Sequence, residues 1–544
     1  MSHAPEKTVR LRIDGVEHEV EPGRSVLQVA LEKNIHVPYF CYHPYLSVPG
    51  NCRQCQVKVG MAQDDGSVRW MPKLQVSCNT RVGDGMVVDT TCDEVQAAQK
   101  HNMEFLLINH PLDCPICDQV GECWLQEHAF TSGPGKTRFR EEKTHFDKHV
   151  DIGPHVVLDK ERCIQCTRCI RFCDEVTGTS ELALFARNDR SEIDIFPGRP
   201  LDNAYSGNVV DICPVGALTL KEFRFRSRLW FLKSQRSVCP GCARGCNIKV
   251  WHRDGGVARI TPVDNPDVNR TWICDEGRLI GDALAARERV REPRAASVDG
   301  ADWERVLDAA ARMLTDAPGK VAAVLGASAT LEETHVALGL LGRLGGSLRV
   351  AVPAHDVGED DALLLRADRT ANRSGVCALL SDAGVAVPLP LEGLMEAARS
   401  GEIRTLLVLH EDLFAAGVGE ERVADWLTGG PAVIVVAAHE SPTTRRAAAV
   451  LPSAVFPEID GTVVNAMGRL QRMRRAYAAP YLARPAVRIL SDLAVRAGQE
   501  EGAKSEADLF NEIGQRVAVF HGLTFDAIGD AGVAVPGLRA PEAS

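Results

Sequence analysis

The sequence predicts a multidomain protein that combines α+β and α/β domains, and three observations lead to this prediction. The chain has 544 residues, enough for about three to four domains of ordinary size. Seventeen of its 18 cysteines lie between Cys41 and Cys274. Beyond position 300, strand and helix patterns alternate. The N-terminal half is therefore expected to hold metal sites, and the C-terminal half a parallel sheet covered by helices.

Composition and charge exclude several classes of protein. Apolar residues make up 45% of the chain and charged residues 25%, values that are typical of globular proteins and argue against disorder. The net charge of −11 argues against electrostatic binding of nucleic acid or anionic lipid. Apolar runs such as residues 431–438 are far shorter than the roughly 20 residues of a membrane span. Residues 1–10 lack the apolar core of a secretory signal, so we expect a reducing cytoplasm, where thiols bind metals or clusters.

The first hundred residues predict a hairpin, a helix and a cysteine loop. Residues 8–13 and 16–20 alternate between apolar and polar side chains, and Asp14-Gly15 between them is a hairpin turn signal. Ser25 can cap the short helix that follows. This order of elements is the one expected of a β-grasp ferredoxin.

Four cysteines of this region form the first candidate site. They are Cys41, Cys52, Cys55 and Cys78. Four thiolates are what a [2Fe–2S] cluster needs, two for each iron, although the first gap is longer than in plant-type ferredoxins. The alternative is zinc, which would use four tetrahedral thiolates with shorter gaps. Cys92 competes with Cys78 as the fourth ligand, but Cys92 opens a helical stretch and is expected to be structural.

One histidine and three cysteines form the second set. They are His110, Cys114, Cys117 and Cys123, on a loop after a helix expected at residues 94–108. Such a set can hold zinc or a [4Fe–4S] cluster. A neutral imidazole in place of a thiolate removes one negative charge, so the reduction potential of the cluster should rise. The compact spacing favours a ligand over an ordinary hydrogen-bonded histidine.

The third set matches a bacterial ferredoxin run, with Asp174 in place of the usual proline. The run is Cys163-x2-Cys166-x2-Cys169-x3-Cys173. In two-cluster ferredoxins, the fourth cysteine of each run binds the other cluster. Cys213-Pro214 would end the second run, but its three earlier cysteine positions hold Asn203, Ser206 and Val209.

The second cluster of this ferredoxin pattern has therefore lost three ligands. We predict a single [4Fe–4S] cluster whose ligands are Cys163, Cys166, Cys169 and Cys213. Cys173 is left over and is expected to pack as a small buried apolar residue.

The fourth set contains four cysteines beyond position 230. They are Cys239, Cys242, Cys246 and Cys274. Residues 248–251 and 258–261 are expected to be short strands joined by a turn at Asp254-Gly255. A zinc ribbon is the alternative for this set. Because three other sets favour clusters, we predict a further [4Fe–4S] cluster, which leaves Cys92, Cys173 and Cys377 without a cofactor.

Charged residues 289–294 predict a linker, beyond which helices and strands alternate. Helices are expected at residues 303–314, 331–344 and 391–399. Continuously apolar strands are expected at residues 321–325, 348–352, 406–409 and 433–438. No G-x-G-x-x-G or Walker motif occurs here, so no nucleotide site is predicted. His410 and His439 follow strands, which is a plausible site position, although a lone histidine is more often structural.

This order of motifs resembles the large iron–sulfur subunit of bacterial NADH:quinone oxidoreductase, respiratory complex I. The resemblance is carried by the runs PYFCYH (38–43), NHPLDCPICD (109–118) and GNVVDICPVGAL (207–218). Residues 239–280 are similar to the cluster-binding lobe of molybdopterin oxidoreductases, as are DGTVVN (460–465) and GRLQ (468–471). The resemblance implies that the last domain descends from a molybdoenzyme but binds no molybdopterin.

The motifs and the resemblance together divide the chain into five domains. They are a [2Fe–2S] β-grasp ferredoxin domain (1–95), a histidine-ligated [4Fe–4S] domain (96–145), a ferredoxin-like domain with one [4Fe–4S] cluster (146–232), a molybdopterin-oxidoreductase-type [4Fe–4S] lobe (233–292) and a degenerate, cofactor-less α/β domain (293–544).

The resemblance implies a chain that conducts electrons and has no catalytic residue of its own. Electrons would enter from a flavin- and NADH-binding subunit and leave through a ferredoxin-like [4Fe–4S] subunit toward quinone. A small [2Fe–2S] subunit and other peripheral-arm subunits would be further partners. The complex would translocate protons, and this chain would lie on the cytoplasmic side of the inner (plasma) membrane without spanning it.

Two other classes of enzyme share parts of this pattern. A molybdenum or tungsten NAD-linked formate dehydrogenase needs a much larger pterin-binding region, and Cys377 is followed by Ala378 instead of the histidine found in those enzymes. An iron-only hydrogenase needs two intact ferredoxin clusters and further cysteines after residue 280. A purely structural zinc protein is the remaining alternative.

Overall fold

The structure is a computed structural model that describes residues 8–498 and 504–538. Most of the polar start, residues 1–10, therefore lies outside the described residues. The chain forms two compact units, Met1–Phe231 and Leu232–Ser544. Among the described residues, no helix is both long enough and apolar enough to cross a membrane. The five expected domain ranges stay predictions.

The first unit begins with a mixed sheet in the order β2-β1-β6-β3-β4, and β5 pairs with β3. β1 is antiparallel to β2 and parallel to β6. The elements are β1 (Val9–Ile13), β2 (Val16–Val20), α1 (Val26–Glu32), β3 (Gln56–Ala62), β4 (Val68–Trp70), β5 (Gln75–Val76) and β6 (Met86–Asp89). The predicted turn is confirmed, because Asp14 and Gly15 have φ angles of 48° and 84°. The predicted cap is confirmed by a capping box between Ser25 and Gln28.

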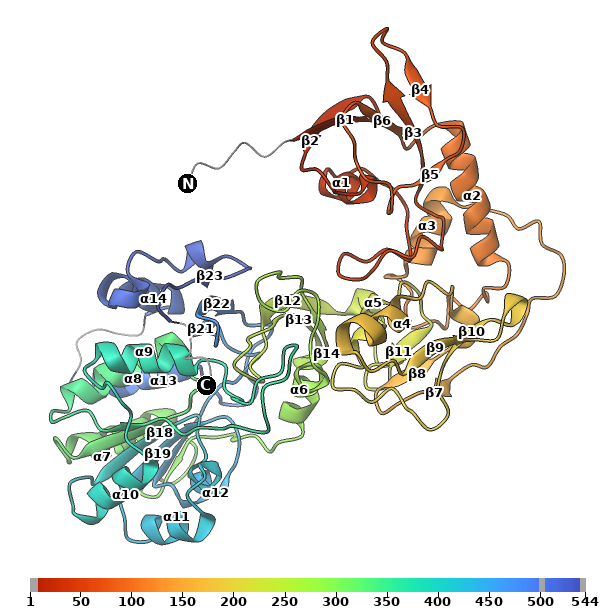
Figure 1. Ribbon diagram of the computed structural model, residues 1–544. Coiled ribbons are helices and arrows are strands. Elements are labelled where there is room, and N and C mark those ends of the chain that lie inside the picture. The colour runs from red at the N-terminus through yellow and green to blue at the C-terminus, as the bar shows by residue number, and fades with distance from the viewer. Residues whose placement is uncertain (1–7, 499–503, 539–544) are drawn as a thin grey trace. The chain divides into compact units, whose positions relative to one another are not determined.

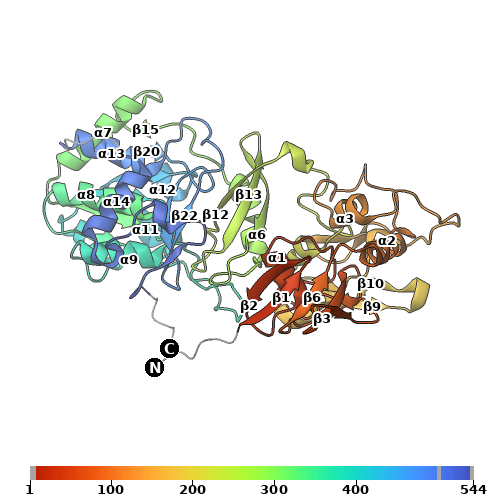
Figure 2. The same cartoon turned by 90° about the horizontal axis from the view of Figure 1, so that it is seen from above.

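The core of this sheet forms because its apolar residues alternate along each strand. Leu11 and Ile13 of β1 and Val57 and Val59 of β3 pack with the apolar face of α1. Figures 1 and 2 show α1 lying along β1 and β2.

The rest of the first unit consists of short elements. They are α2 (Asp93–Leu107), α3 (Trp124–Ser132), β7 (Val150–Asp151), β8 (Val156–Leu158), η1 (Lys160–Arg162), α4 (Arg168–Phe172), η2 (Cys173–Thr177), β9 (Leu182–Phe185), η3 (Asn188–Arg190), β10 (Glu192–Ile195), α5 (Asn208–Ile212), β11 (Leu218–Leu220) and η4 (Leu229–Phe231). Two small sheets have the orders β11-β8-β7 and β10-β9. Loops between these elements carry most of the predicted ligands.

The second unit opens with a three-stranded antiparallel sheet in the order β12-β13-β14. Its elements are β12 (Lys233–Val238), β13 (Asn247–Arg253) and β14 (Gly256–Pro262), followed by α6 (Asp275–Ala285). Asp254 and Gly255 have φ angles of 53° and 77°, which confirms the predicted turn between β13 and β14.

A six-stranded sheet in the order β15-β20-β19-β18-β16-β17 dominates the second unit, and all its pairs are parallel except β15 with β20. The strands are β15 (Arg294–Ala295), β16 (Val321–Leu325), β17 (Val350–Ala351), β18 (Thr405–Leu409), β19 (Ala432–Ala437) and β20 (Ala449–Pro452). The helices are α7 (Trp303–Thr315), α8 (Leu331–Arg343), α9 (Arg373–Asp382), α10 (Leu391–Arg399), α11 (Glu420–Leu427), α12 (Pro442–Arg446), α13 (Ala486–Arg496) and α14 (Glu506–Arg516).

Both faces of this sheet are buried, as the continuously apolar strands predict. Leu407 and Leu409 of β18 pack on the side of α7, α8 and α13, whereas Leu406 and Val408 pack on the side of α10 and α11. Figure 1 shows α8, α9 and α13 on one side of the strands and α10 and α11 on the other. Three further strands, β21 (Gly461–Val464), β22 (Arg469–Met473) and β23 (Val533–Ala534), form a separate antiparallel sheet.

The prediction of a linker at residues 289–294 was wrong. Val290 is fully buried, and its N–H donates to the carbonyl of Ala438 at 3.0 Å. Arg289 forms two hydrogen bonds of 2.8 and 2.9 Å with the carboxylate of Glu458. The charges of this segment are therefore paired with residues distant in the sequence, so the segment is part of the second unit.

Candidate iron–sulfur sites

The first thiol set meets where the cysteine loop joins the mixed sheet. Cys41 and Cys52 are hydrogen-bonded to each other, as are Cys55 and Cys78. The hydrogen bond from Cys52 lowers the pKa of Cys41 to about 6, and the bond from Cys78 lowers the pKa of Cys55 to about 7. Thiols that ionise this easily suit a site whose ligands are thiolates.

Cys92, the rival fourth ligand, directly precedes α2. Its backbone N–H donates to Asp89 Oδ1 at 2.9 Å. Cys78 instead is buried and paired with Cys55. The structure thus brings Cys78 to the set and keeps Cys92 at the start of the helix.

His110, Cys114, Cys117 and Cys123 line one small cavity of about 20 Å³. His110 follows α2, and Cys123 directly precedes α3. Nδ1 of His110 is buried without a hydrogen-bond partner. Burial lowers the pKa of His110 to about 4, so its imidazole is neutral at pH 7 and can act as a ligand.

Two residues outside the motif shape this second site. Gly216 approaches Cys117 so closely that an added Cβ would lie 2.3 Å from Sγ. Arg228 donates to the carbonyl oxygens of Cys117 at 2.6 Å and Pro115 at 2.7 Å, which holds the loop in place. Sequence patterns do not reveal either role, because both depend on contacts between distant segments.

The third set surrounds α4 and the end of α5. Cys163 and Cys166 lie on the loop before α4, Cys169 lies within it, and Cys213 follows α5. Electrostatic interactions link Cys169 to Cys163, Cys166 and Cys213, so the four thiols lie close together. Gln165 and Thr167 have positive φ angles of 51° and 60°, so the loop winds tightly around the set. Burial raises the pKa of Cys166 to about 11.

The place of the lost second cluster is occupied by a polar network. Cys173 is fully buried, as predicted, but its thiol is hydrogen-bonded to the carboxylate of Glu181. Nδ2 of Asn203 donates to the same carboxylate at 2.9 Å. The expected apolar environment of Cys173 is therefore wrong, because Glu181 and Asn203 approach it from other segments.

The fourth set lies between β12, β13 and α6. Cys239, Cys242 and Cys246 lie on the loop between the strands, and Cys274 directly precedes α6, where its Sγ accepts from the N–H of Gly277 at 3.3 Å. An added Cβ on Gly277 would lie 3.1 Å from Sγ of Cys239. All four cysteines are buried.

The DGTVVN and GRLQ runs support the loop of this fourth set. Nε2 of Gln471 donates to the carbonyl of Gly245 at 2.9 Å, and Nδ2 of Asn465 donates to that of Arg244 at 3.1 Å. Gly245 has a φ angle of +62°, and an added Cβ would lie 2.7 Å from Oε1 of Gln471. The close approach of Gln471 and the backbone angle both require glycine at this position.

The four sets differ from single-ion sites. A zinc site brings four ligand atoms to about 2.0–2.3 Å from one ion. In the described parts of the chain, no three His, Cys, Asp or Glu side chains are placed to hold one ion. The glycine contacts of Gly216 and Gly277 and the unpartnered Nδ1 of His110 fit ligands that surround a cofactor.

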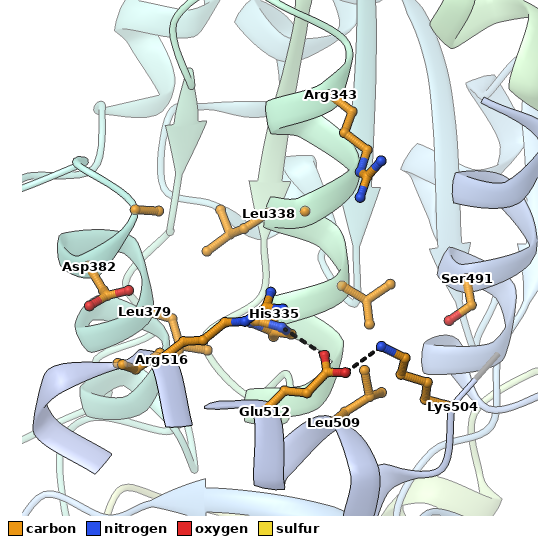
Figure 3. Close-up of a pocket in the computed structure, with 14 residues that line it drawn as sticks. His335, Leu338, Arg343, Leu379, Asp382, Ser491, Lys504, Leu509, Glu512 and Arg516 are labelled. Carbon is orange, nitrogen blue, oxygen red and sulfur yellow. Dashed lines mark hydrogen bonds and ion pairs between the residues drawn. The ribbon is translucent and has the colours of Figure 1, made fainter. Parts of the chain in front are cut away.

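Two other cavities lie in the second unit. One, of about 300 Å³, contains His410 and His439, and Nε2 of His410 lies 3.2 Å from Oε1 of Glu333. The other, of about 410 Å³, lies between α8, α9, α13 and α14 (Figure 3). There Glu512 pairs with Lys504, and its carboxylate lies 3.9 Å from Nε2 of His335. None of the predicted ligands lines either cavity.

Five family profiles match the chain. They are a 2Fe-2S iron-sulfur cluster binding domain (residues 6–92), the NADH-ubiquinone oxidoreductase-G iron-sulfur binding region (99–138), the ferredoxin-like domain of NADH-quinone oxidoreductase subunit 3 (153–219), the molybdopterin oxidoreductase Fe4S4 domain (232–285) and molybdopterin oxidoreductase (370–496).

Several curated proteins resemble the chain in sequence. The G subunit of the NADH-quinone oxidoreductase of Streptomyces coelicolor is 40% identical over 61% of this chain and 39% of its own length. The same subunit of the Rickettsia felis enzyme is 39% identical over 62% of this chain and 50% of its own length. Subunit 3 of the Thermus thermophilus enzyme is 39% identical over 60% of this chain and 45% of its own length. The chain thus spans half or less of the length of these relatives.

Among solved structures, a chain of the NAD+-reducing [NiFe]-hydrogenase in the H2-reduced state is 27% identical, with a TM-score of 0.35, over 41% of this chain and 91% of that chain. That TM-score is too low to compare the folds. The sequence matches are specific, and over the matched residues this chain is a relative of the large iron–sulfur subunit, the G subunit, of NADH-quinone oxidoreductases.

Proposed function

We propose that this chain is an iron–sulfur electron-transfer subunit of an NADH:quinone oxidoreductase. It would contain one [2Fe–2S] and three [4Fe–4S] clusters, each of which takes up and releases one electron when bound. The proposed ligands are Cys41, Cys52, Cys55 and Cys78; His110, Cys114, Cys117 and Cys123; Cys163, Cys166, Cys169 and Cys213; and Cys239, Cys242, Cys246 and Cys274. We expect no catalytic residue and no molybdopterin in the chain.

The observation that carries this proposal is a shared core in the first unit. One buried cluster of side chains includes Cys41 of the first set, Cys123 of the second, and Cys163, Cys166 and Cys213 of the third. Phe40, Leu125 and Val215 fill the space among them. Sets that share one dry core lie close enough for a relay, and their ligands are held rigidly, so an electron can move with little rearrangement.

The proposal includes the folds and partners that the resemblance implies. Residues 1–95 would be a β-grasp ferredoxin domain, and residues 146–232 a ferredoxin-like domain. A flavin- and NADH-binding subunit would donate electrons, and a ferredoxin-like [4Fe–4S] subunit would accept them. A small [2Fe–2S] subunit and other peripheral-arm subunits would complete the assembly, on the cytoplasmic face of the membrane.

The test uses the intact complex, purified anaerobically. Iron and acid-labile sulfide should match one two-iron and three four-iron centres per chain, and EPR should show reducible signals. Cys166→Ala should remove one four-iron signal and stop NADH-driven quinone reduction, while artificial acceptors at the flavin are still reduced. Intact quinone reduction in this variant would contradict the proposal, as would a colourless, iron-free protein or one molybdenum per chain.

A further inference from the structure

Two buried arginines of α4 lie between the first and third thiol sets. Arg168 is 2% exposed, and Arg171 is 8% exposed. In the parts of the chain that the structure describes, neither guanidinium has a carboxylate within 4.0 Å. A buried charge without a counterion is costly, so these two positive charges need an explanation.

The hydrogen bonds of both guanidinium groups go to backbone carbonyls of the ligand loops. Nη2 of Arg171 donates to the carbonyl of Cys41 at 2.6 Å and to that of Cys166 at 3.3 Å. Arg168 donates to the carbonyl of Ile212, next to Cys213, at 3.0 Å and to that of Tyr42, next to Cys41. Each arginine therefore joins the loop of the first set to the loop of the third.

The surroundings fix both side chains in this position. The guanidinium of Arg168 lies over the ring of Trp124, with 4.5 Å to the ring centroid. Arg171 also donates to the carbonyl of Ser47 and to Oγ1 of Thr167.

Thiolates supply the strongest electrostatic attraction to both arginines. The thiolate of Cys166 is the strongest partner of Arg168 and of Arg171. For Arg171, the thiolate of Cys41 comes next, ahead of the carboxylate of Glu175. The negative charge that balances these guanidinium groups therefore comes mainly from the ligand sets.

We propose that Arg168 and Arg171 are shared counterions and positioning residues for the first and third iron–sulfur sites. The proposal rests on the function proposed above. Reduction adds one negative charge to either site, and a fixed positive charge favours the reduced form. Loss of one guanidinium should therefore lower both reduction potentials. At a separation of about 10 Å and an effective dielectric constant near 20, one charge changes a one-electron equilibrium by about tenfold, which corresponds to about 59 mV.

The experiment compares Arg171→Gln and Arg171→Lys by EPR redox titration of the anaerobic holoprotein in its complex. Arg171→Gln keeps part of the hydrogen bonding but loses the charge, so both potentials should fall by about 59 mV. Arg171→Lys keeps the charge, so both should stay near the values of the unmodified protein. A purely structural arginine would give equal results for the two variants. Arg289→Gln is the matched control, because it removes a buried guanidinium that already has Glu458 as its partner.

Unchanged potentials at both centres in Arg171→Gln would overturn the inference, while the signals themselves would leave the proposed function intact. If the unmodified protein lacked these centres, the proposed function would fail instead. If Arg171→Gln does not assemble, Arg168→Gln serves as the second variant with the same expectation, and unchanged potentials in that variant would again overturn the inference.

Discussion

Replacing Gly216 with alanine should remove the histidine-ligated centre and leave the others in place. The added Cβ would lie 2.3 Å from Sγ of Cys117 and 3.1 Å from Cβ of Gln119. Nonbonded carbon and sulfur atoms need about 3.5–4.0 Å. Sγ of Cys117 would therefore have to move by more than about 1 Å, whereas a metal ligand tolerates about 0.2 Å. Strain from overpacking should also lower the free energy of unfolding by about 1–3 kcal/mol.

The assay is iron content together with EPR of the anaerobic protein. Gly216→Ala should lose about four irons per chain and the signal of one four-iron centre, with the [2Fe–2S] signal unchanged. Gly83→Ala is the control, because its added Cβ would meet only Cε of Met86 at 3.8 Å, an ordinary contact. Thermal unfolding of both variants separates loss of the cofactor from general destabilisation.

A result that would refute this reasoning is simple to recognise. If Gly216→Ala keeps full iron content and an unaltered four-iron spectrum, Cys117 does not hold a cofactor in the place where the structure puts its thiol. Loss of every centre together would indicate global misfolding, and the control would then have to fold normally for the conclusion to hold.

Three further predictions concern other residues. Cys78→Ser should abolish the [2Fe–2S] signal whereas Cys92→Ser should keep it, as EPR of the two variants will show, because only Cys78 is paired with Cys55. His110→Cys should lower the potential of its centre in a redox titration, since a thiolate adds a negative charge; an unchanged or higher potential would argue against His110 as a ligand. Burial raises the pKa of Glu332 from 4.5 to about 7. Its stabilising contribution is therefore complete below pH 4.5 and is lost as the pH rises through 7. Between these limits the protein should lose about 3 kcal/mol of unfolding free energy that Glu332→Gln does not lose, and urea unfolding at pH 5 and 8 that shows equal losses in both proteins would contradict this.

Local patterns predicted most of the elements and the grouping of ligands. Asp14-Gly15, Ser25 and the apolar strand at Thr405–Leu409 act within a few residues of themselves, so their roles are visible in the sequence. Spacing also grouped Cys163 with Cys213, because the ferredoxin pattern records a long-range pairing in a short motif.

What the sequence did not reveal depends on contacts between distant segments. Arg289 was expected in a solvated linker, but Glu458, 169 positions away, binds it. Cys173 was expected among apolar side chains, but Glu181 hydrogen-bonds to it. Gly216 and Arg171 carry no motif of their own, and their importance follows only from which loops they touch.

The composition of the cores suggests how folding and cofactor binding are linked. The mixed sheet has a core of aliphatic side chains, such as Leu11, Ile13 and Val59, that can support it without a cofactor. The shared core of the three ligand sets has few such residues, and cysteines from all three make up much of it. Its elements are short, so they gain little stability from their own hydrogen bonds. Because metal binding adds to folding free energy when ligands come from separate segments, residues 96–231 should depend on their cofactors for order far more than the sheet does. On this view, cysteine in this region replaces the aliphatic core that a domain of its size would otherwise need.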